Sequence, residues 1–423
     1  MKLLVFAHTP PPHHGQSYMV RLMLEGFGGD RRRQRTEAPG GYGIECYHVN
    51  ARFSSTPQEI GGFKLKKPIF LLGYCLQAIW CRFRFGVRNF YYIPAPGQRA
   101  ALYRDWLVML LCRPFFKCTI FHWHAAGLLD WLKTSVSGPA QGFTHRLMDR
   151  VDLSIVLSKF NRLDAEKLVS KRIQIIGNGI PDPCPQFKQE ILPKRLARFE
   201  ARKPLFVGQA GGPHLVRVLY LAHCTREKGL FDALDAIALA NRRFAFSSSR
   251  LRLHLTVAGE FVNAYERDEF ERRLQNPDLQ LPVAYRPLVG ELNEDSDESG
   301  APSAIRYLGF INGPQKAGAF ADSDLFCFPT FYHAESFGLV LVEAMAFGLP
   351  IITTRWRSLP ELFPPGYPGL VDVRSPDQMA QAFESVLREP TGENLRELFL
   401  RRFTFQNFLS ELAEALRTVE SNY

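Results

Sequence analysis

The 423-residue chain lacks most of the features that mark metal-binding, disulfide-rich or membrane-spanning proteins. Its eight cysteines form no CxxC pair, and none is grouped with histidine at the spacing of a zinc site. We therefore expect no disulfide framework and no metal site, as is usual in a reducing cytoplasm. The longest apolar stretches, Pro68 to Cys81 and Trp106 to Phe116, are shorter than the roughly 20 residues of a spanning helix. The sequence thus predicts no membrane-spanning helix.

Other signatures are absent as well. The apolar run within Met1 to His8 is too short for the core of a signal peptide, and we interpret it as a first strand. No internal period of 20 to 50 residues is visible, which argues against solenoids and propellers. The chain carries no RNP, helix-turn-helix or zinc-finger pattern, so nothing in it is typical of a known nucleic-acid-binding module.

Charge is distributed unevenly along the chain. Residues 1–203 contain 31 Lys and Arg against 14 Asp and Glu, a balance of +17, whereas the remainder contains 21 against 28, a balance of −7. This asymmetry indicates that the first half faces an anionic partner. Nucleic acid, acidic phospholipid and a phosphorylated substrate all satisfy this condition.

Short apolar runs alternate with stretches of helical length, a pattern typical of parallel sheets that are buried on both faces. The sequence therefore predicts an α/β fold with two doubly wound, Rossmann-like domains. The expected strands are Lys2 to His8, Phe90 to Pro94, Cys118 to His124, Leu153 to Leu157, Arg172 to Ile176, Arg217 to Ala222, Leu253 to Ala258, Ile305 to Leu308, Leu325 to Phe328, Ile351 to Thr353 and Leu370 to Val373.

A proline-rich stretch between the two strand sets suggests the domain boundary. We predict a first domain over 1–185, a linker region over 186–213, a second domain over 214–400 and a C-terminal helix over 401–423 that packs back on the first domain. The acidic segment from Leu292 to Pro302 is expected to be a solvated loop within the second domain.

The most informative segment is ESFGLVLVEAMAFGLP, which begins at Glu335 and follows an expected strand. From Phe337 to Phe347 it is apolar on all sides of a helix, yet it contains the carboxylate Glu343, which is costly to bury without a partner. Eight helical residues rise about 12 Å, so Glu335 and Glu343 could contact opposite ends of one ligand. The N–H groups near Gly338 and Leu339 suit a diphosphate. Taken singly, Glu335 is also explained as an acidic residue in the first turn of a helix, where the helix dipole favours it. Glu343 is also explained as a helix residue that faces solvent.

This spacing of two glutamates resembles the donor-nucleotide motif of retaining GT-B glycosyltransferases of family 4 (group 1), and the resemblance covers roughly residues 1–363. It implies a retaining transfer of a glycosyl unit from a nucleotide diphosphate sugar, with Glu343 on the ribose, Glu335 on the donor sugar and the acceptor in an interdomain cleft. Further matching elements are Asn178-Gly179-Ile180-Pro181-Asp182, Lys228-Gly229, Ala258-Gly259-Glu260, Tyr307-Leu308-Gly309 and Ile351 to Leu362.

Lys228 follows a buried strand and precedes a helical pattern, where a lysine can neutralise phosphate charge. Taken alone it is an ordinary surface lysine, but the resemblance implies a diphosphate contact. The family often has Gly-Arg five residues earlier, and this chain has Ala222-His223 there. Four residues are candidates to replace that arginine, namely His223, Arg226, Arg355 and Arg357.

In the first half, Gly15 follows the first strand at a turn where backbone N–H groups can approach a ligand, although a purely structural turn explains it equally well. His122 and His124 stand at the carboxyl end of an expected strand, and alternation places both imidazoles on one face. The resemblance places an acceptor-site histidine here, and the residues leave open which one it is, with a mild preference for His124. The other reading is a histidine that is hydrogen-bonded within the core.

Lys64 to Lys67, together with Arg82 and Arg84, flank the apolar stretch from Pro68 to Cys81. An apolar face framed by cations suits the surface of an anionic bilayer, and a buried helix with solvated ends is the alternative. A lipid-linked acceptor would explain why the acceptor half carries the positive charge.

We thus expect a cytoplasmic glycosyltransferase, peripheral on the cytoplasmic face of the cell membrane, in cell-surface polysaccharide or glycolipid synthesis. Its expected substrates are a UDP- or GDP-sugar donor and a saccharide or lipid-linked acceptor, with no cofactor, no metal and no nucleic acid. The competing hypothesis is a non-catalytic nucleic-acid-binding protein that uses the basic first half.

Overall fold

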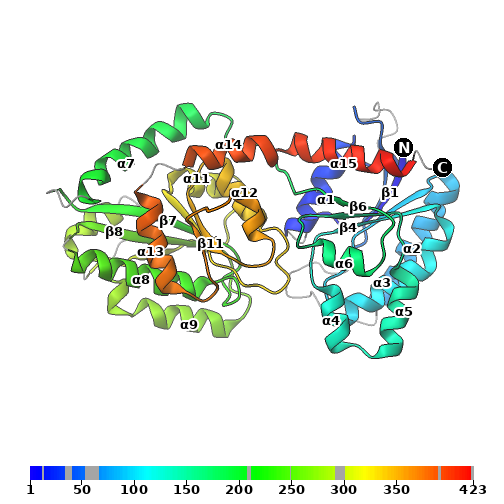
Figure 1. Ribbon diagram of the computed structural model, residues 1–423, viewed down its shortest axis with the longest axis horizontal. Coiled ribbons are helices and arrows are strands. Elements are labelled where there is room, and N and C mark those ends of the chain that lie inside the picture. The colour runs from blue at the N-terminus through cyan, green and yellow to red at the C-terminus, as the bar shows by residue number, and fades with distance from the viewer. Residues whose placement is uncertain are drawn as a thin grey trace. The chain divides into compact units, whose positions relative to one another are not determined.

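A computed structural model describes residues 1–11, 14–33, 41–52, 66–206, 211–247, 249–290, 301–388 and 392–420 (Figure 1). The chain divides into two compact units. Unit 1 comprises Met1–Ile180, Ala334–Phe337 and Phe403–Tyr423, and unit 2 comprises Pro181–His333 and Gly338–Arg402.

Unit 1 is built on a six-stranded sheet with the order β2-β1-β3-β4-β5-β6, in which every neighbouring pair is parallel. All six residues of β4 are buried, as expected for a central strand covered on both faces. The strands are β1 (Lys2–Phe6), β2 (Glu45–Val49), β3 (Asn89–Tyr92), β4 (Cys118–Trp123), β5 (Leu153–Val156) and β6 (Ile173–Ile175), and the helices are α1 (Gly15–Gly26), α2 (Lys66–Phe85), α3 (Arg99–Cys112), α4 (Leu128–Ser135), α5 (Gly138–Met148), α6 (Arg162–Lys167) and α15 (Phe405–Glu420).

Unit 2 contains a second six-stranded parallel sheet with the order β12-β11-β10-β7-β8-β9. Its strands are β7 (His214–Leu221), β8 (Leu251–Ala258), β9 (Ile305–Tyr307), β10 (Leu325–Phe328), β11 (Ile351–Thr354) and β12 (Leu370–Val371), and its helices are α7 (Leu192–Phe206), α8 (Leu230–Phe246), α9 (Ala264–Leu274), α10 (Arg286–Gly290), α11 (Gly313–Asp322), α12 (Leu339–Ala346), α13 (Pro376–Leu387) and α14 (Gly392–Arg402).

The period of two along β10 explains how this sheet is covered. Leu325 and Cys327 belong to the core cluster that α8 and α13 complete. Phe326 points to the opposite face, where its ring lies 5.5 Å from that of Phe320 on α11. Helices α8 and α13 pack against each other, as do α12 and α14 (Figure 1). A strand that is apolar at every position is therefore buried between two helical layers.

The α/β fold class is confirmed, and each strand expected from the sequence is present, with ends that differ by a few residues. One strand, β2, was not expected. Its sequence is Glu-Cys-Tyr-His-Val, in which two polar residues interrupt the apolar pattern. As an edge strand that pairs only with β1 among the described strands, β2 needs no continuous apolar run.

The segment predicted as a linker, 186–213, differs from that expectation. It contains the helix α7, and the unit division places it in unit 2. Pro193 and Pro204 lie in the first and last turns of α7, and proline in a first turn removes no helical hydrogen bond. The proline count suggested a linker because sequence alone does not show where in a helix a proline falls.

Some expectations concern residues outside the described ranges. Lys64 is one, and most of the predicted loop from Leu292 to Pro302 is another. Among the helices that the structure describes, none is long and apolar enough to cross a membrane.

Candidate active site

In unit 2, Lys228 lies in the loop between β7 and α8, at the carboxyl end of the sheet. Gly229 follows it with φ of +80°, and a Cβ atom there would lie 2.2 Å from the carbonyl oxygen of Pro329. Only glycine fits, so this loop packs directly against the loop that follows the adjacent strand β10. The Lys228 Nζ lies 4.6 Å from the centre of the Tyr332 ring. The fold thus holds a lysine cation where two neighbouring strands end.

His223 and Arg226 lie in the same loop but differ in their surroundings. Burial, and then the charge of Lys228, lower the pKa of His223, so its imidazole is neutral near pH 7. The Arg226 guanidinium lies 3.9 Å from a carboxylate oxygen of Glu269 on α9 and stacks over Phe231. Of the two, His223 has the electrostatic contact with Lys228, and Arg226 is already engaged by α9.

The other two candidate arginines follow β11. Arg355 is half-exposed and lies 3.3 Å from Asp372. Arg357 has φ of +49°, and its guanidinium lies 5.4 Å from the centre of the Trp356 ring. Neither contact involves the Lys228 loop.

Glu343 has a partner that the sequence analysis did not identify. Its Oε1 accepts a hydrogen bond of 2.6 Å from Nζ of Lys316 on α11, and both side chains are less than one-third exposed. The pair explains how a carboxylate is tolerated on the apolar helix α12. Lys316 is the single cation of Gly313–Asp322, which is the signal that could have identified it.

The predicted helix beginning at Phe337 is wrong at its start. The helix α12 begins at Leu339, after Gly338 at φ of +70°, so Glu335 precedes the helix by several residues. The separation of about 12 Å calculated for a continuous helix therefore does not apply to Glu335 and Glu343. From the sequence alone, Gly338 could be interpreted as a residue within the helix. Only the structure shows that its backbone is left-handed and that the helix begins after it.

Glu335 belongs to Ala334–Phe337, the short segment that packs within unit 1. Its neighbour Ser336 is buried, and the Ser336 hydroxyl donates a 2.5 Å hydrogen bond to the carbonyl oxygen of His124. The Ser336 carbonyl in turn accepts a hydrogen bond from the side-chain amide of Asn161. Two residues predicted from distant parts of the sequence, Glu335 and His124, thus lie on contacting segments.

His122 and His124 lie on one face, as strand alternation predicts, with ring centres 4.2 Å apart. His122 is 1% exposed, and its Nδ1 is hydrogen-bonded to the hydroxyl of Tyr91 on β3. Burial holds the pKa of His122 well below its usual value, and burial with the charge of His14 lowers the pKa of His124 to about 3. Both imidazoles are therefore neutral near pH 7, and His124 is the more exposed of the two.

A second pair of imidazoles lies near His124. His14 is the N-cap of α1, and its Nε2 lies 2.8 Å from Nε2 of His8 at the end of β1. Gly15 opens this helix, and within the described residues, apart from its chain neighbours and its own helix backbone, no atom lies within 4 Å of a Cβ placed there. The protein itself therefore imposes no steric need for glycine at this position, which leaves room for a ligand.

Sequence reasoning missed several of these residues. His8 follows a buried strand in the same way as His124, so the rule that selected His124 would also have selected His8. Tyr91 had no such signal, because its partner His122 comes from another strand. Within the described ranges, no group of three or more His, Cys, Asp or Glu residues is arranged to hold a metal ion.

Comparison with known proteins bears on unit 2 most directly. Residues 215–399 match the family model of glycosyl transferases group 1. This range contains Lys228, Glu335 and Glu343 together with the whole second sheet. The second unit is thus similar to the group 1 glycosyltransferases over residues 215–399. The resemblance stated from the sequence motifs is thereby confirmed.

Two curated relatives extend this finding. A phosphatidyl-myo-inositol mannosyltransferase of Mycobacterium leprae is 30% identical over 153 residues, 34% of this chain and 39% of that protein. The O-antigen chain mannosyltransferase B of Escherichia coli is 29% identical over 164 residues, 37% of this chain and 41% of that protein. The chain thus spans about two-fifths of the length of the relatives that it matches.

A likeness in fold extends over the whole chain. The crystal structure of Anabaena Alr3699/HepE in complex with UDP covers 99% of this chain and 100% of its own, with a TM-score of 0.58 and 15% identity. The two parallel, doubly wound sheets are therefore those of the GT-B fold.

Proposed function

We propose that this chain is a retaining glycosyltransferase that moves a sugar from a nucleotide diphosphate sugar to a saccharide or lipid-linked acceptor in cell-surface polysaccharide or glycolipid synthesis. The observation that carries the proposal is Lys228, held by the Gly229–Pro329 contact at the carboxyl edge of a group 1 glycosyltransferase domain. The names of the mannosyltransferase relatives and the UDP in the Anabaena structure support it. The family match also disfavours the nucleic-acid-binding alternative.

In this proposal, unit 2 binds the donor. Lys228 stabilises the negative charge that accumulates on the departing diphosphate, and a fixed cation does so with little reorganisation. The helix α12 begins at Leu339 after Gly338, and the positive end of its dipole favours an anion there. Glu343 accepts hydrogen bonds from the ribose hydroxyls while Lys316 holds its carboxylate. His223, as a neutral imidazole, can donate one hydrogen bond to a phosphate oxygen. Arg226 can contact the diphosphate only if its guanidinium moves away from Glu269.

The residues of unit 1 take the acceptor side and the donor sugar. His124 is proposed to contact the acceptor or the reacting centre, with His122 behind it and Tyr91 fixing the orientation of His122. Glu335 is proposed to bind hydroxyls of the donor sugar, and the backbone at Gly15 to approach the ligand closely. A neutral imidazole can accept or donate a hydrogen bond, which suits a neutral hydroxyl group.

The helix α2 supports a lipid-linked acceptor at an anionic membrane. One face of α2 is buried through Cys75, Ala78 and Cys81, but large apolar residues cover the rest, including Trp80 at 52% and Phe83 at 67% exposed. The alternative of a fully buried helix is therefore wrong. Exposed aromatic side chains near basic residues are typical of helices that lie in a membrane interface. The exposed apolar residues of α2 are Ile69, Phe70, Leu72, Leu76, Trp80 and Phe83.

A thermal-shift panel of UDP-, GDP- and ADP-sugars tests the donor part of the proposal. Only a ligand that binds the folded state raises the melting temperature, so one nucleotide series should stabilise the protein selectively. The Lys228→Ala variant should lose most of that stabilisation, whereas Lys203→Ala, on the exposed side of α7, should retain it. Equal responses to all nucleotides, or none in either protein, would contradict the proposal.

A further inference from the structure

A cavity lies in unit 2, at the amino-terminal edge of the sheet. Its volume is about 30 Å³, and it is lined by residues of α7, by Asp324 just before β10, by Gly348 and Pro350 before β11, and by the first residues of α14. Lys228 and Gly338 instead follow the carboxyl ends of strands. No residue proposed for the donor or acceptor lines this cavity.

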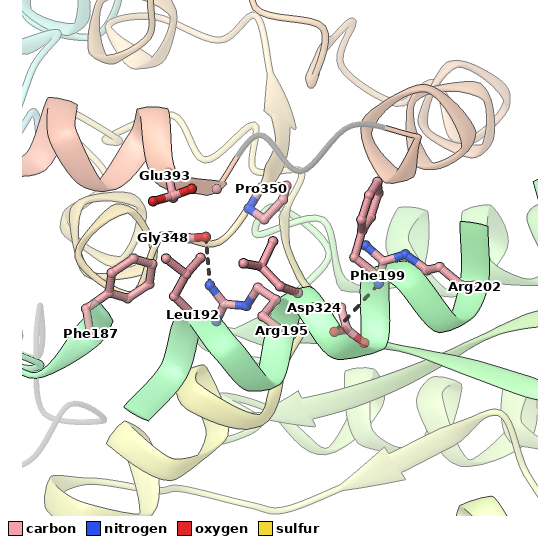
Figure 2. Close-up of a pocket in the computed structure, with 11 residues that line it drawn as sticks. Phe187, Leu192, Arg195, Phe199, Arg202, Asp324, Gly348, Pro350 and Glu393 are labelled. Atoms are coloured by element: carbon pink, nitrogen blue, oxygen red, sulfur yellow. Dashed lines mark hydrogen bonds and ion pairs between the residues drawn. The ribbon is translucent and has the colours of Figure 1, made fainter. Parts of the chain in front are cut away.

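Two buried arginines of α7 direct unsatisfied donors into it (Figure 2). Arg195, 8% exposed, donates through Nη1 to the carbonyl oxygens of Phe347 and Gly348, but its Nε and Nη2 have no hydrogen-bond partner among the described residues. Arg202, 3% exposed, likewise lacks partners for Nε and Nη1 in the described structure, and its Nη1 lies 3.7 Å from Asp324. Buried cationic donors without acceptors are costly, so an acceptor is expected.

The carboxylates at the cavity neutralise the two arginines only in part, and neither accepts a hydrogen bond from Arg195 or Arg202 among the described residues. Asp324 is fully buried, but one oxygen accepts a 2.7 Å hydrogen bond from Arg198 and the other accepts the backbone N–H of Arg217. Glu393 is exposed at the rim. Burial lowers the pKa of Arg195 to about 10, and the charge of the nearby Asp324 offsets this effect only in part.

A helix terminus adds to the positive character of the cavity. The eleven-residue helix α14 begins here with Gly392, and a Cβ on Gly392 would lie 2.0 Å from the carbonyl oxygen of Gly348. Glycine is thus required for the helix start to pack this closely against Gly348, whose carbonyl oxygen also accepts a hydrogen bond from Arg195. The first N–H groups of a helix have no acceptor within the helix and carry its positive dipole.

We propose that this cavity is a binding site for a small oxyanion, with inorganic phosphate as the fitting ligand, held by Arg195, Arg202 and the first turn of α14. A guanidinium group can donate two parallel hydrogen bonds to two oxygens of one phosphate, and the helix terminus supplies further N–H donors. The bound anion connects α7 and α14, which are separate segments of unit 2. The site is independent of the donor residues.

The test is calorimetric titration of the full chain with sodium phosphate at constant ionic strength, with thermal unfolding in parallel. We expect one saturable phosphate per chain and a rise in melting temperature of about 5 °C at a hundredfold excess over Kd. Lys228→Ala must retain this binding, which separates the cavity from the diphosphate site. Absence of saturable binding in the unaltered protein would overturn the proposal without any variant.

Arg202→Met should weaken phosphate binding by at least about tenfold, the usual effect of losing a charged hydrogen-bond donor. Lys203→Met, on the exposed side of the same helix, removes the same charge and should leave the affinity unchanged. Equal affinity in both variants would contradict the site. If Arg202→Met does not fold, Arg202→Lys keeps the charge but not the paired donors and should show the same direction of change.

Discussion

The candidate residues of unit 1 are buried and neutral, whereas those of unit 2 are charged. In unit 1 the imidazoles of His122 and His124 are packed against each other, and burial keeps them neutral. In unit 2 the candidate groups are ionic and stabilised by neighbours, with Lys228 over an aromatic ring and Glu343 bonded to Lys316. The difference suits two kinds of ligand, because neutral imidazoles favour hydroxyl groups and fixed charges favour a diphosphate.

Removing the lysine of unit 2 should have the largest effect. We expect Lys228→Ala to lower kcat/KM by about 10²–10³-fold, as when a group that stabilises transition-state charge is lost. The variant should weaken binding of UDP or GDP, whichever is the donor nucleotide, and leave binding of the free nucleoside unchanged. Calorimetry with both ligands checks this, and equal losses would remove Lys228 from the phosphate contact.

The histidines of unit 1 should separate transfer from donor binding. We expect His124→Ala to reduce transfer by about 10²-fold with donor affinity retained, because an interaction in the transition state is lost. His122→Ala should reduce transfer less and lower thermal stability more, since His122 is buried against Tyr91. Full activity of both variants and of the double variant would return the pair to a structural role.

Glu343→Gln should weaken the donor nucleotide and its free nucleoside equally, by about tenfold, because its expected contact is the ribose. This pattern is the opposite of that for Lys228→Ala, so the two variants together locate each contact. Lys316→Met is the matched control, since it breaks the ion pair but leaves the carboxylate. Unchanged nucleoside affinity in folded Glu343→Gln would show that the glutamate has only a structural role.

Unit 1 should lose more stability in acid than unit 2, because His8, His122 and His124 all have strongly lowered pKa values there, whereas in unit 2 only His254 has its pKa lowered to about 4. The folded-state pKa of His124 is lowered to about 3 and that of His8 to about 4, from 6.5 for both. At a pH between each folded-state pKa and 6.5, the unfolded chain binds more protons than the folded chain. The contribution of these histidines to stability is therefore fully present above about pH 6.5 and is lost as the pH falls. For His124 the loss from pH 6.5 to 5 is about 2 kcal/mol.

Proteolysis across pH 7 to 5, with cleavage sites mapped to each unit, checks this order. His124→Gln should reduce the acid sensitivity of unit 1. Equal acid sensitivity in the variant and the unaltered protein would show that His124 is not the titrating group.

The smallest expected effect per residue concerns the surface of unit 1. Liposome sedimentation should show binding to anionic vesicles that weakens as salt screens the charge. Neutralising Lys64, Lys66 and Lys67 should weaken the free energy of vesicle binding by roughly 1 kcal/mol per lysine. Trp80→Ser should reduce the part of the binding that salt does not affect. Equal binding to neutral and anionic vesicles would favour an acceptor that is not at a membrane.

Much of the fold was predictable because buried parallel strands are continuous apolar runs, as in Cys118–Trp123 and Leu325–Phe328. The strand Glu45–Val49 and the helix Leu192–Phe206 were not, since one carries polar residues at an edge and the other carries prolines at its ends. Lys228, His122 and His124 were identifiable by their place after or at the end of strands. Their contacts were not, because each partner comes from another strand or loop.

The sequence by itself determined the two α/β sheets and the group 1 glycosyltransferase motif, because periodicity and the residues at strand ends are local properties of the chain. Only the tertiary structure decided that Glu335 packs with unit 1, that Lys316 holds Glu343 and that two buried arginines face one cavity. These features depend on which distant segments meet and on how much water their side chains lose. Neither quantity is contained in a local pattern of residues.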